Sequence, residues 1–254
     1  MKRLLITVFA ALSVLTAPAW ARDWQTIQAS GKLHAITEGA FYPFNYFEGQ
    51  TLTGFEVELA EAIAKELGLA IEWRTVSFDA QIAAIQQGRY DFAIASHGYT
   101  EQRAKAVDFT NPHYCAGGMI AARKDGPLTV KALAGKTVAV QIGTSYLENA
   151  RKIPGLKALK TYKSDPEAFA ALKASKVDAW ISDRFLVKAT LEKNGDPNLA
   201  AGEQVFYERV SMILQKNNPE LKEKLNEGLA AIMRNGVYQR LSQKYFGEDV
   251  SCPE

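Results

Sequence analysis

The chain has 254 residues, of which 47% are hydrophobic and 23% are charged, and 30 basic against 28 acidic side chains give a net charge of +2. So much apolar content with so little net charge excludes a disordered chain, and the charge balance gives no support for nucleic-acid binding. Only one stretch is continuously apolar, which excludes a multi-span membrane protein. Two cysteines and three histidines are too few for a zinc framework, so we expect neither a metal nor a cofactor.

The first 21 residues are typical of a secretory signal peptide. Two basic residues precede an apolar run at 4–17, and Ala19-Trp20-Ala21 supplies the small-x-small cleavage pattern. The alternative is a membrane anchor, but the run is shorter than the roughly 20 residues that a bilayer requires. We therefore expect a soluble periplasmic protein that begins near Arg22. No cysteine lies at the cut, which argues against a lipoprotein.

Short apolar runs alternate with helical patterns in the remaining chain, which is typical of an α/β protein. In the first half, we expect strands at 33–37, 69–76 and 91–95, and helices at 55–67, 80–87 and 100–106. The pattern restarts after Asn111-Pro112, with strands expected at 119–123, 137–142 and 177–181, a helix after Ser145, a helix capped by Ser164 and a helix at 184–193.

The last stretch predicts a strand at 210–215, an amphipathic helix that opens at Asn218-Pro219, and a short helix at 237–246. These two helices need a sheet to cover, and the first α/β unit is the one short of helices. We therefore expect the chain to return to the first lobe, with crossings near 114–118 and 207–211. This predicts lobe 1 at 22–114 plus 209–254, lobe 2 at 115–208, and a ligand cleft at a two-strand hinge.

Export also bears on whether Cys115 and Cys252 form a disulfide. An even cysteine count in an oxidising compartment favours a disulfide, which would connect the C-terminal tail to the middle of the chain. Two free thiols, one buried and one in a frayed tail, remain the alternative, because the sequence does not show whether the two Cα atoms are close enough.

Motifs of hydrolases and nucleotide enzymes are absent from the sequence. It contains no Gly-x-Ser-x-Gly elbow, P-loop, dinucleotide glycine motif or His-Glu-x-x-His, so no catalytic residue is assigned. The three histidines lack metal-ligand spacing. His97 alone lies at the end of a predicted strand, where ligands of open α/β sheets bind, and is a candidate to line the cleft.

Charged residues near strand ends suggest a site for a zwitterion. Arg103 can hold a carboxylate bidentately, the helix beginning at Thr144-Ser145 offers backbone N–H groups, and Asp183 is an anion for an ammonium group. Each has a simpler interpretation: Arg103 can lie on a solvated helix face, and Asp183 can cap the helix that follows. Together, a carboxylate clamp and an ammonium clamp describe an α-amino-acid site.

Three further residues suit the ligand side chain. Phe41 and Phe78 can enclose an aliphatic stem, and Glu38 can meet a polar or cationic tip. Ligands with hydrogen-bond donors at the tip are favoured, while glutamate and aspartate would be repelled.

Residues 30–250 resemble the periplasmic amino-acid-binding proteins of ABC importers, polar amino-acid type. The resemblance is carried by the ordered motifs at 37–44, 54–60, 88–91, 100–110, 143–145 and 177–183. It implies the two-lobed periplasmic-binding-protein fold, and its ligand positions fall on Arg103 for the α-carboxylate, Asp183 for the α-ammonium, Ser96, Gly98, Thr144 and Ser145 for backbone or hydroxyl contacts, Phe41 and Phe78 for the walls, and Glu38 and Gln141 for the ligand side chain. Many relatives have a hydroxyl residue where Gly98 stands in this chain. The glycine therefore removes one hydrogen bond to the ligand carboxylate or leaves it to the backbone N–H.

The resemblance implies a monomeric protein that captures a cationic or amide L-amino acid by lobe closure. Its partners would be the permease and ATPase of an ABC importer, with no role in nucleic-acid binding. Two alternatives belong to other classes: a dehydratase-type enzyme on the same scaffold, with Glu38 as its general acid, and a sensor that reports the ligand to a membrane partner.

Overall fold

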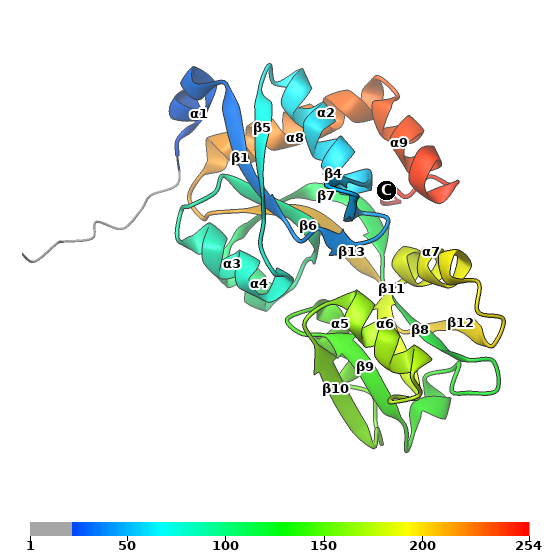
Figure 1. The fold of residues 1–254 in the computed structure, drawn as a ribbon. Helices are drawn as coiled ribbons and strands as arrows, with labels where there is room; N and C mark the ends of the chain where they lie inside the picture. Colours follow the sequence, from blue (N-terminus) through cyan, green and yellow to red (C-terminus); the bar gives the residue numbers. More distant parts are fainter. Residues whose placement is uncertain (1–21, 254) are drawn as a thin grey trace, which may run out of the picture.

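The computed structural model describes residues 22–253, so the signal peptide expected at 1–21 lies outside the described residues. Two lobes are visible in Figure 1, and each contains a five-stranded sheet with helices packed on it. This two-lobed α/β architecture confirms the fold class that the sequence predicts.

Lobe 1 is the upper lobe in Figure 1. The first part of the chain supplies α1 (Trp24–Ser30), β1 (Lys32–Thr37), α2 (Phe55–Glu66), β5 (Ala70–Thr75), α3 (Phe78–Gln86), β6 (Phe92–Gly98), α4 (Glu101–Ala106) and β7 (Asp108–Ala116). The last part supplies β13 (Glu208–Leu214), α8 (Pro219–Arg234) and α9 (Val237–Phe246). A separate small sheet consists of β2 (Ala40–Phe41), β3 (Asn45–Glu48) and β4 (Thr51–Thr53). The main sheet has the order β5-β1-β6-β13-β7, and β13 is antiparallel to both of its neighbours.

Lobe 2 comes from one continuous stretch of chain. Its elements are β8 (Gly118–Arg123), a 3₁₀ turn (Lys131–Leu133), β9 (Thr137–Gln141), α5 (Ser145–Ala150), β10 (Ala158–Tyr162), α6 (Asp165–Lys173), β11 (Ala179–Asp183), α7 (Arg184–Asn194) and β12 (Leu199–Gln204). The sheet has the order β10-β9-β11-β8-β12. Because β9 is parallel to both β10 and β11, the carboxyl ends of these strands lie at one edge, which faces lobe 1.

Helix α8 shows why the chain returns to lobe 1. Its buried side chains recur at helical spacing, at Leu221, Leu225, Leu229 and Ile232. Its Gly228 permits a close approach to α2, since a Cβ atom at this position would come within 2.7 Å of Ile63 Cγ2. The helix therefore buries its apolar face on lobe 1, as the sequence predicts.

Two adjacent segments connect the lobes. The first passes from β7 to β8 through Gly117, whose φ of 149° favours glycine and whose Cβ would come within 1.8 Å of Phe206 O. Phe206 itself belongs to the second segment, between β12 and β13. The Val205 amide donates to Gly118 O at 2.6 Å. These contacts hold the two connections side by side, in the arrangement of a two-strand hinge.

A disulfide joins Cys115, near the start of the first connection, to Cys252 in the C-terminal tail. The Cys115 amide also donates to Val250 O at 3.0 Å. The disulfide that the even cysteine count favoured is therefore confirmed. It fixes the C-terminal tail at the point where the chain leaves lobe 1.

Some expectations need correction. Phe78, which lies between the strand expected at 69–76 and the helix expected at 80–87, is the first residue of α3. Ser164 stands at the N-cap of α6 but makes no capping hydrogen bond through its side chain. The sequence patterns also miss α1, β7, β10, β12 and the small sheet. The chain breaker Pro112 concealed β7; it is tolerated because β7 is an edge strand of the sheet. Within residues 22–253, no helix is both long and apolar enough to cross a bilayer.

Candidate functional site

A buried carboxylate organises the lobe 1 side of the cleft. Glu56 Oε1 accepts from the Ser96 amide at 2.7 Å and lies 2.9 Å from His113 Nε2, while its Oε2 accepts from Asn45 Nδ2 at 2.8 Å. Asn45 Oδ1 in turn accepts from the Gly39 amide at 2.9 Å. This network fixes the end of β6, where Ser96 has a φ of 59°, against the loop that follows β1.

Arg103 spans the two lobes. Thr100 is the N-cap of its helix α4, and Arg103 is 5% exposed. Nη1 donates to Gly98 O in lobe 1, and Nη2 donates to Gly143 O in lobe 2, each at 2.8 Å. Because a guanidinium has five N–H donors, three remain for another acceptor. Arg103 is therefore buried between the lobes rather than on a solvated helix face.

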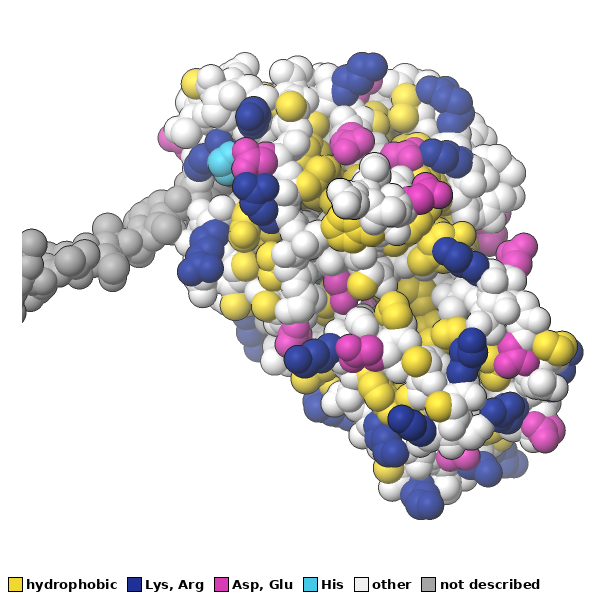
Figure 2. Space-filling view, viewed as in Figure 1, with side chains coloured by type: hydrophobic (Ala, Val, Ile, Leu, Met, Phe, Trp, Pro, Cys, Tyr) yellow, Lys and Arg dark blue, Asp and Glu magenta, His cyan; other side chains and the backbone are white. Residues whose placement is uncertain are grey.

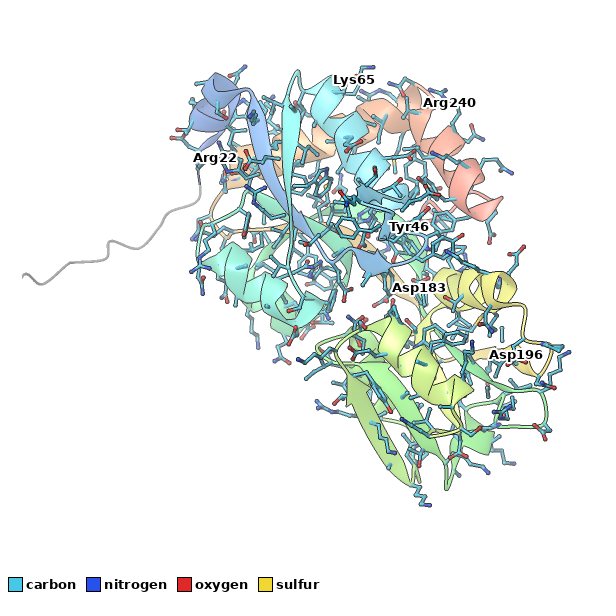
Figure 3. All side chains as sticks on the ribbon, in the orientation of Figure 1. Arg22, Tyr46, Lys65, Asp183, Asp196 and Arg240 are labelled. Carbon is cyan, nitrogen blue, oxygen red and sulfur yellow. A yellow bond between two sulfur atoms is a disulfide. The ribbon has the colours of Figure 1, made fainter. Side chains whose placement is uncertain are left out.

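Asp183 performs one of the two roles that the sequence allowed, the helix cap, and it also faces the space between the lobes. It ends β11 and caps α7, because Oδ1 accepts from the Phe185 amide at 2.7 Å. Oδ2 lies 3.4 Å from the Tyr114 hydroxyl and 3.5 Å from the Tyr146 hydroxyl. Burial raises the pKa of Asp183 to about 7. One oxygen thus completes the helix, and the other faces hydroxyl groups between the lobes; Figure 3 shows Asp183 where the lobes meet.

Glu38 and Gln141 form a second contact between the lobes. Gln141 Nε2 donates to Glu38 Oε1 at 2.5 Å and to Lys163 O at 3.1 Å. Burial raises the pKa of Glu38 to about 8, and the negative charge of Asp165 adds to the shift. The two residues that we expected to read the ligand side chain therefore meet directly.

Six of the expected ligand residues line one small cavity between the lobes. They are Phe41, Phe78, Ser96, Gln141, Thr144 and Ser145, and Ala95 and Tyr146 complete the wall. The cavity measures about 10 Å³, which is about the volume needed for one water molecule. An amino acid can enter only if the lobes part.

His97 does not line this cavity. It is fully buried, with its ring stacked on Phe78 at a centroid distance of 4.8 Å. Burial, together with the positive charge of Arg103, lowers the pKa of His97 well below its usual range. The histidine therefore supports the Phe78 wall as a neutral ring.

Glu208 is the residue that the sequence analysis missed. It is the first residue of β13, it is 7% exposed, and neither carboxylate oxygen has a hydrogen-bond partner among the described residues. Burial raises the pKa of Glu208, while the nearby Ser145 and Tyr146 hydroxyls and the positive charge of Arg103 act in the opposite direction. Its Oε2 would lie 1.9 Å from a Cβ atom at Gly98. The missing hydroxyl residue at 98 was the sequence signal, because the Glu208 carboxylate takes the place of that side chain.

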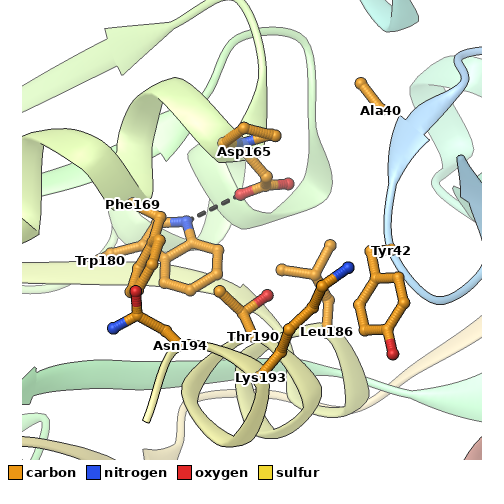
Figure 4. Close-up of a pocket in the computed structure, with 10 residues that line it drawn as sticks. Ala40, Tyr42, Asp165, Phe169, Trp180, Leu186, Thr190, Lys193 and Asn194 are labelled. Atoms are coloured by element: carbon orange, nitrogen blue, oxygen red, sulfur yellow. Dashed lines mark hydrogen bonds between the residues drawn. The ribbon is translucent and has the colours of Figure 1, made fainter. Parts of the chain in front are cut away.

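A larger pocket opens at the junction of the lobes. It has a volume of about 350 Å³ and combines Ala40 and Tyr42 of lobe 1 with residues of α6, β11 and α7. Figure 4 shows these side chains around the open space. On the face shown in Figure 2, hydrophobic side chains gather along the junction of the lobes.

Two α/β lobes on a two-strand hinge, with polar side chains facing each other across the cleft, define a ligand-binding protein that works by lobe closure. The chain belongs to the bacterial extracellular solute-binding proteins, family 3, whose family model matches residues 33–248.

Similar proteins share nearly the full length of the chain. The probable amino-acid-binding protein YxeM of Bacillus subtilis is 31% identical, covering 100% of this chain and 98% of its own length. The L-cystine-binding protein TcyJ of Escherichia coli is also 31% identical, covering 89% and 86%. The solved structure of an ancestral arginine-binding protein bound to arginine is 34% identical with a TM-score of 0.82, covering 85% of this chain and 99% of that one.

Proposed function

We propose that the protein captures a polar L-amino acid between its lobes outside the cytoplasm and delivers it to the permease and ATPase of an ABC importer. The observation that carries this proposal is the pair of opposite charges buried at the interlobe cleft, Arg103 and Asp183. Arg103 has unused donors for an α-carboxylate, and Asp183 Oδ2, which has long contacts with the Tyr114 and Tyr146 hydroxyls, can also accept from an α-ammonium group. Family membership and the amino-acid-binding relatives support the same assignment.

The site favours a ligand whose side chain carries hydrogen-bond donors. Glu38 and Gln141 meet across the cleft, and a cationic tip would pair with the Glu38 carboxylate. An acidic ligand would face an unfavourable charge there. We therefore infer a cationic or amide amino acid, and an arginine-bound relative agrees with this choice.

Lobe closure follows from the organisation of the chain. We infer lobe 1 at 22–114 plus 209–254 and lobe 2 at 115–208, with the two connections as the hinge. Because the cavity measures about 10 Å³, the ligand enters an open form and the lobes close over it. We infer a monomer that is released into the periplasm after signal cleavage at the N-terminal segment.

Arg103→Ala tests the site. By calorimetry, we expect it to reduce amino-acid affinity more than about a hundredfold, because the ligand carboxylate loses its charged partner in a buried site. Arg89→Ala, at an exposed arginine of lobe 1, is the matched control and should bind as the wild type does. A thermal-shift screen of the 20 amino acids with ornithine and citrulline identifies the ligand beforehand. Tight binding by the Arg103 variant would refute the assignment.

The dehydratase alternative rests on Glu38. In the ligand-free protein a carboxyl group with a pKa of about 8 holds its proton at neutral pH, as a general acid requires, whereas a cationic ligand beside it would favour the carboxylate. However, the clamp of Arg103 and Asp183 is complete, which a catalyst would not need. We therefore infer a binding protein without catalysis. Formation of product from a cyclohexadienyl substrate, and its loss in Glu38→Gln, would favour the enzyme.

A further inference from the structure

We propose that the 350 Å³ pocket at the lobe junction binds a second zwitterionic end of the ligand, with Asp165 holding an ammonium group and Lys193 a carboxylate. The inference rests on the proposed amino-acid site and specifies its ligand further: an elongated amino acid whose side chain ends in a second α-amino-acid unit.

Asp165 is an incompletely used acceptor in this pocket. It is 2% exposed, and its Oδ1 accepts from Trp180 Nε1 at 2.7 Å. Its Oδ2 has no hydrogen-bond partner of normal geometry among residues 22–253, although the Ser182 hydroxyl is near enough to lower the pKa of Asp165. Figure 4 shows this oxygen on the side of the open space, away from the indole. A buried carboxylate oxygen without a donor is costly, and an ammonium group in the pocket would supply that donor.

Lys193 supplies the opposite charge. It lies on α7, is exposed, and its Nζ stands 4.3 Å from the centroid of the Tyr42 ring. The ring holds the ammonium over the pocket by a cation–π contact. Asp165 and Lys193 thus repeat, on a second wall, the pairing of acid and base that Asp183 and Arg103 provide in the first site.

The pocket walls suit the atoms that join the two ends. Phe169 and Trp180 are packed with a centroid distance of 5.3 Å and line the pocket with Leu186. These apolar surfaces can cover a thioether, disulfide or methylene chain. The volume lies within the range of small-molecule sites.

The pocket adjoins the amino-acid site at Glu38. The negative charge of Asp165 acts on Glu38, whose pKa is raised mainly by burial, so the two carboxyl groups are near each other. Phe41 lines the small cavity, while its neighbours Ala40 and Tyr42 line the larger pocket. Gln141, which lines the small cavity, donates to Glu38 across the lobes. When the lobes part, a long ligand can pass this contact and reach Asp165.

L-Cystine and S-methyl-L-cysteine are the matched probes. S-methyl-L-cysteine keeps one half of L-cystine, carries a methyl group in place of the second sulfur, and lacks the distal α-amino-acid unit. Calorimetry on the mature protein should give at least about thirtyfold tighter binding of L-cystine, from added charge-assisted hydrogen bonds. Asp165→Asn should reduce this ratio at least about tenfold and keep the amide oxygen as acceptor for Trp180. Lys193→Gln, at an exposed position, should reduce the ratio about threefold or more. Asp125→Asn, at an exposed turn of the same lobe, is the control and should leave the ratio unchanged.

The outcomes separate this inference from the proposed function. If no amino acid binds, the proposed function itself is wrong. If amino acids bind but L-cystine gains nothing over S-methyl-L-cysteine, or if both the Asp165 and the Lys193 variants keep the full ratio, the second subsite is refuted. Because Lys193 is exposed, its variant tests the subsite even if Asp165→Asn does not fold.

Discussion

The carboxylate of Glu208 lies over the Cα atom of Gly98, so close that a Cβ atom at residue 98 would come within 1.9 Å of Glu208 Oε2. Glycine at the end of β6 and glutamate at the start of β13 therefore form one unit, at the point where the chain re-enters lobe 1. The pair places a third charged group close to Arg103 and Asp183: the charge of Arg103 acts on Glu208, and the charge of Glu208 acts on Asp183.

This unit predicts coupling between substitutions. Gly98→Ala should lower the free energy of unfolding by about 1 kcal/mol or more, because the buried carboxylate must move. In a Glu208→Ala background the same substitution should cost at least about 1 kcal/mol less, since the obstructing atoms are gone. Urea denaturation of the four proteins in a double-mutant cycle measures the difference. Additive costs would show that the two residues do not interact in solution.

Glu38 should determine which side chain is accepted. In Glu38→Gln, a cationic ligand loses a charged partner while an amide ligand keeps a neutral one, so affinity for arginine relative to glutamine should fall about tenfold. Competition calorimetry with the two amino acids measures the ratio, and Glu101→Gln, exposed on α4, is the matched control. An unchanged preference would remove Glu38 from the specificity site.

Stability of the ligand-free protein should fall as the pH rises from 5 to 8. Burial raises the pKa of Glu38 to about 8 and the pKa values of Asp165 and Asp183 to about 7. Between the unfolded and folded pKa values only the folded state holds these protons, so the stabilisation is complete below the unfolded pKa and is lost as pH rises through the folded pKa.

We expect a decrease in the free energy of unfolding on the order of 3 kcal/mol over this interval, measured by urea denaturation at several pH values. Glu38→Gln, which cannot titrate, should show a smaller slope. Stability that is constant or increases with pH would contradict the burial of these carboxyl groups.

The disulfide should contribute strongly to lobe 1. Cys115 and Cys252 are separated by 137 residues, and closing so long a loop lowers the entropy of the unfolded chain. The double variant Cys115→Ser with Cys252→Ser should be less stable by about 2–4 kcal/mol in denaturant. A reductant should destabilise the wild type and leave the double variant unchanged; equal responses would contradict the assignment.

Local patterns were sufficient for elements whose burial is periodic or continuous. Strand β6 is buried along its whole length, and α8 carries a regular apolar face, so both were predicted from the sequence. Strand β10, with two exposed residues in five, and β7, which contains Pro112, lack such a signal. Their places are decided by sheet partners distant in sequence, which no local window contains.

The candidate site likewise contains residues that local sequence predicts and residues that only distant contacts place. Arg103 and Asp183 were predicted because strand ends in α/β folds gather ligand residues, and family motifs suggested the walls. Glu208 follows β12 after a short connection with the exposed Tyr207, so its neighbours indicate a surface position. Only the pairing of β13 with β6, which sets Val210 opposite Gly98, brings it into the cleft. Likewise, the unpaired oxygen of Asp165 depends on the position of Trp180, fifteen residues away.

The strand order of lobe 1 imposes an order of assembly. β13 lies between β6 and β7, yet it follows every strand of lobe 2 in the chain. A polypeptide that emerges N-terminus first thus presents the complete sheet of lobe 2 while the sheet of lobe 1 still lacks its inner strand. Lobe 2 can fold as a unit on emergence, whereas lobe 1 must hold β6 and β7 unpaired along their facing edges until β13 arrives. The lobe that begins first is therefore the one that finishes last, and Cys252, farther along the chain, can reach Cys115 only afterwards.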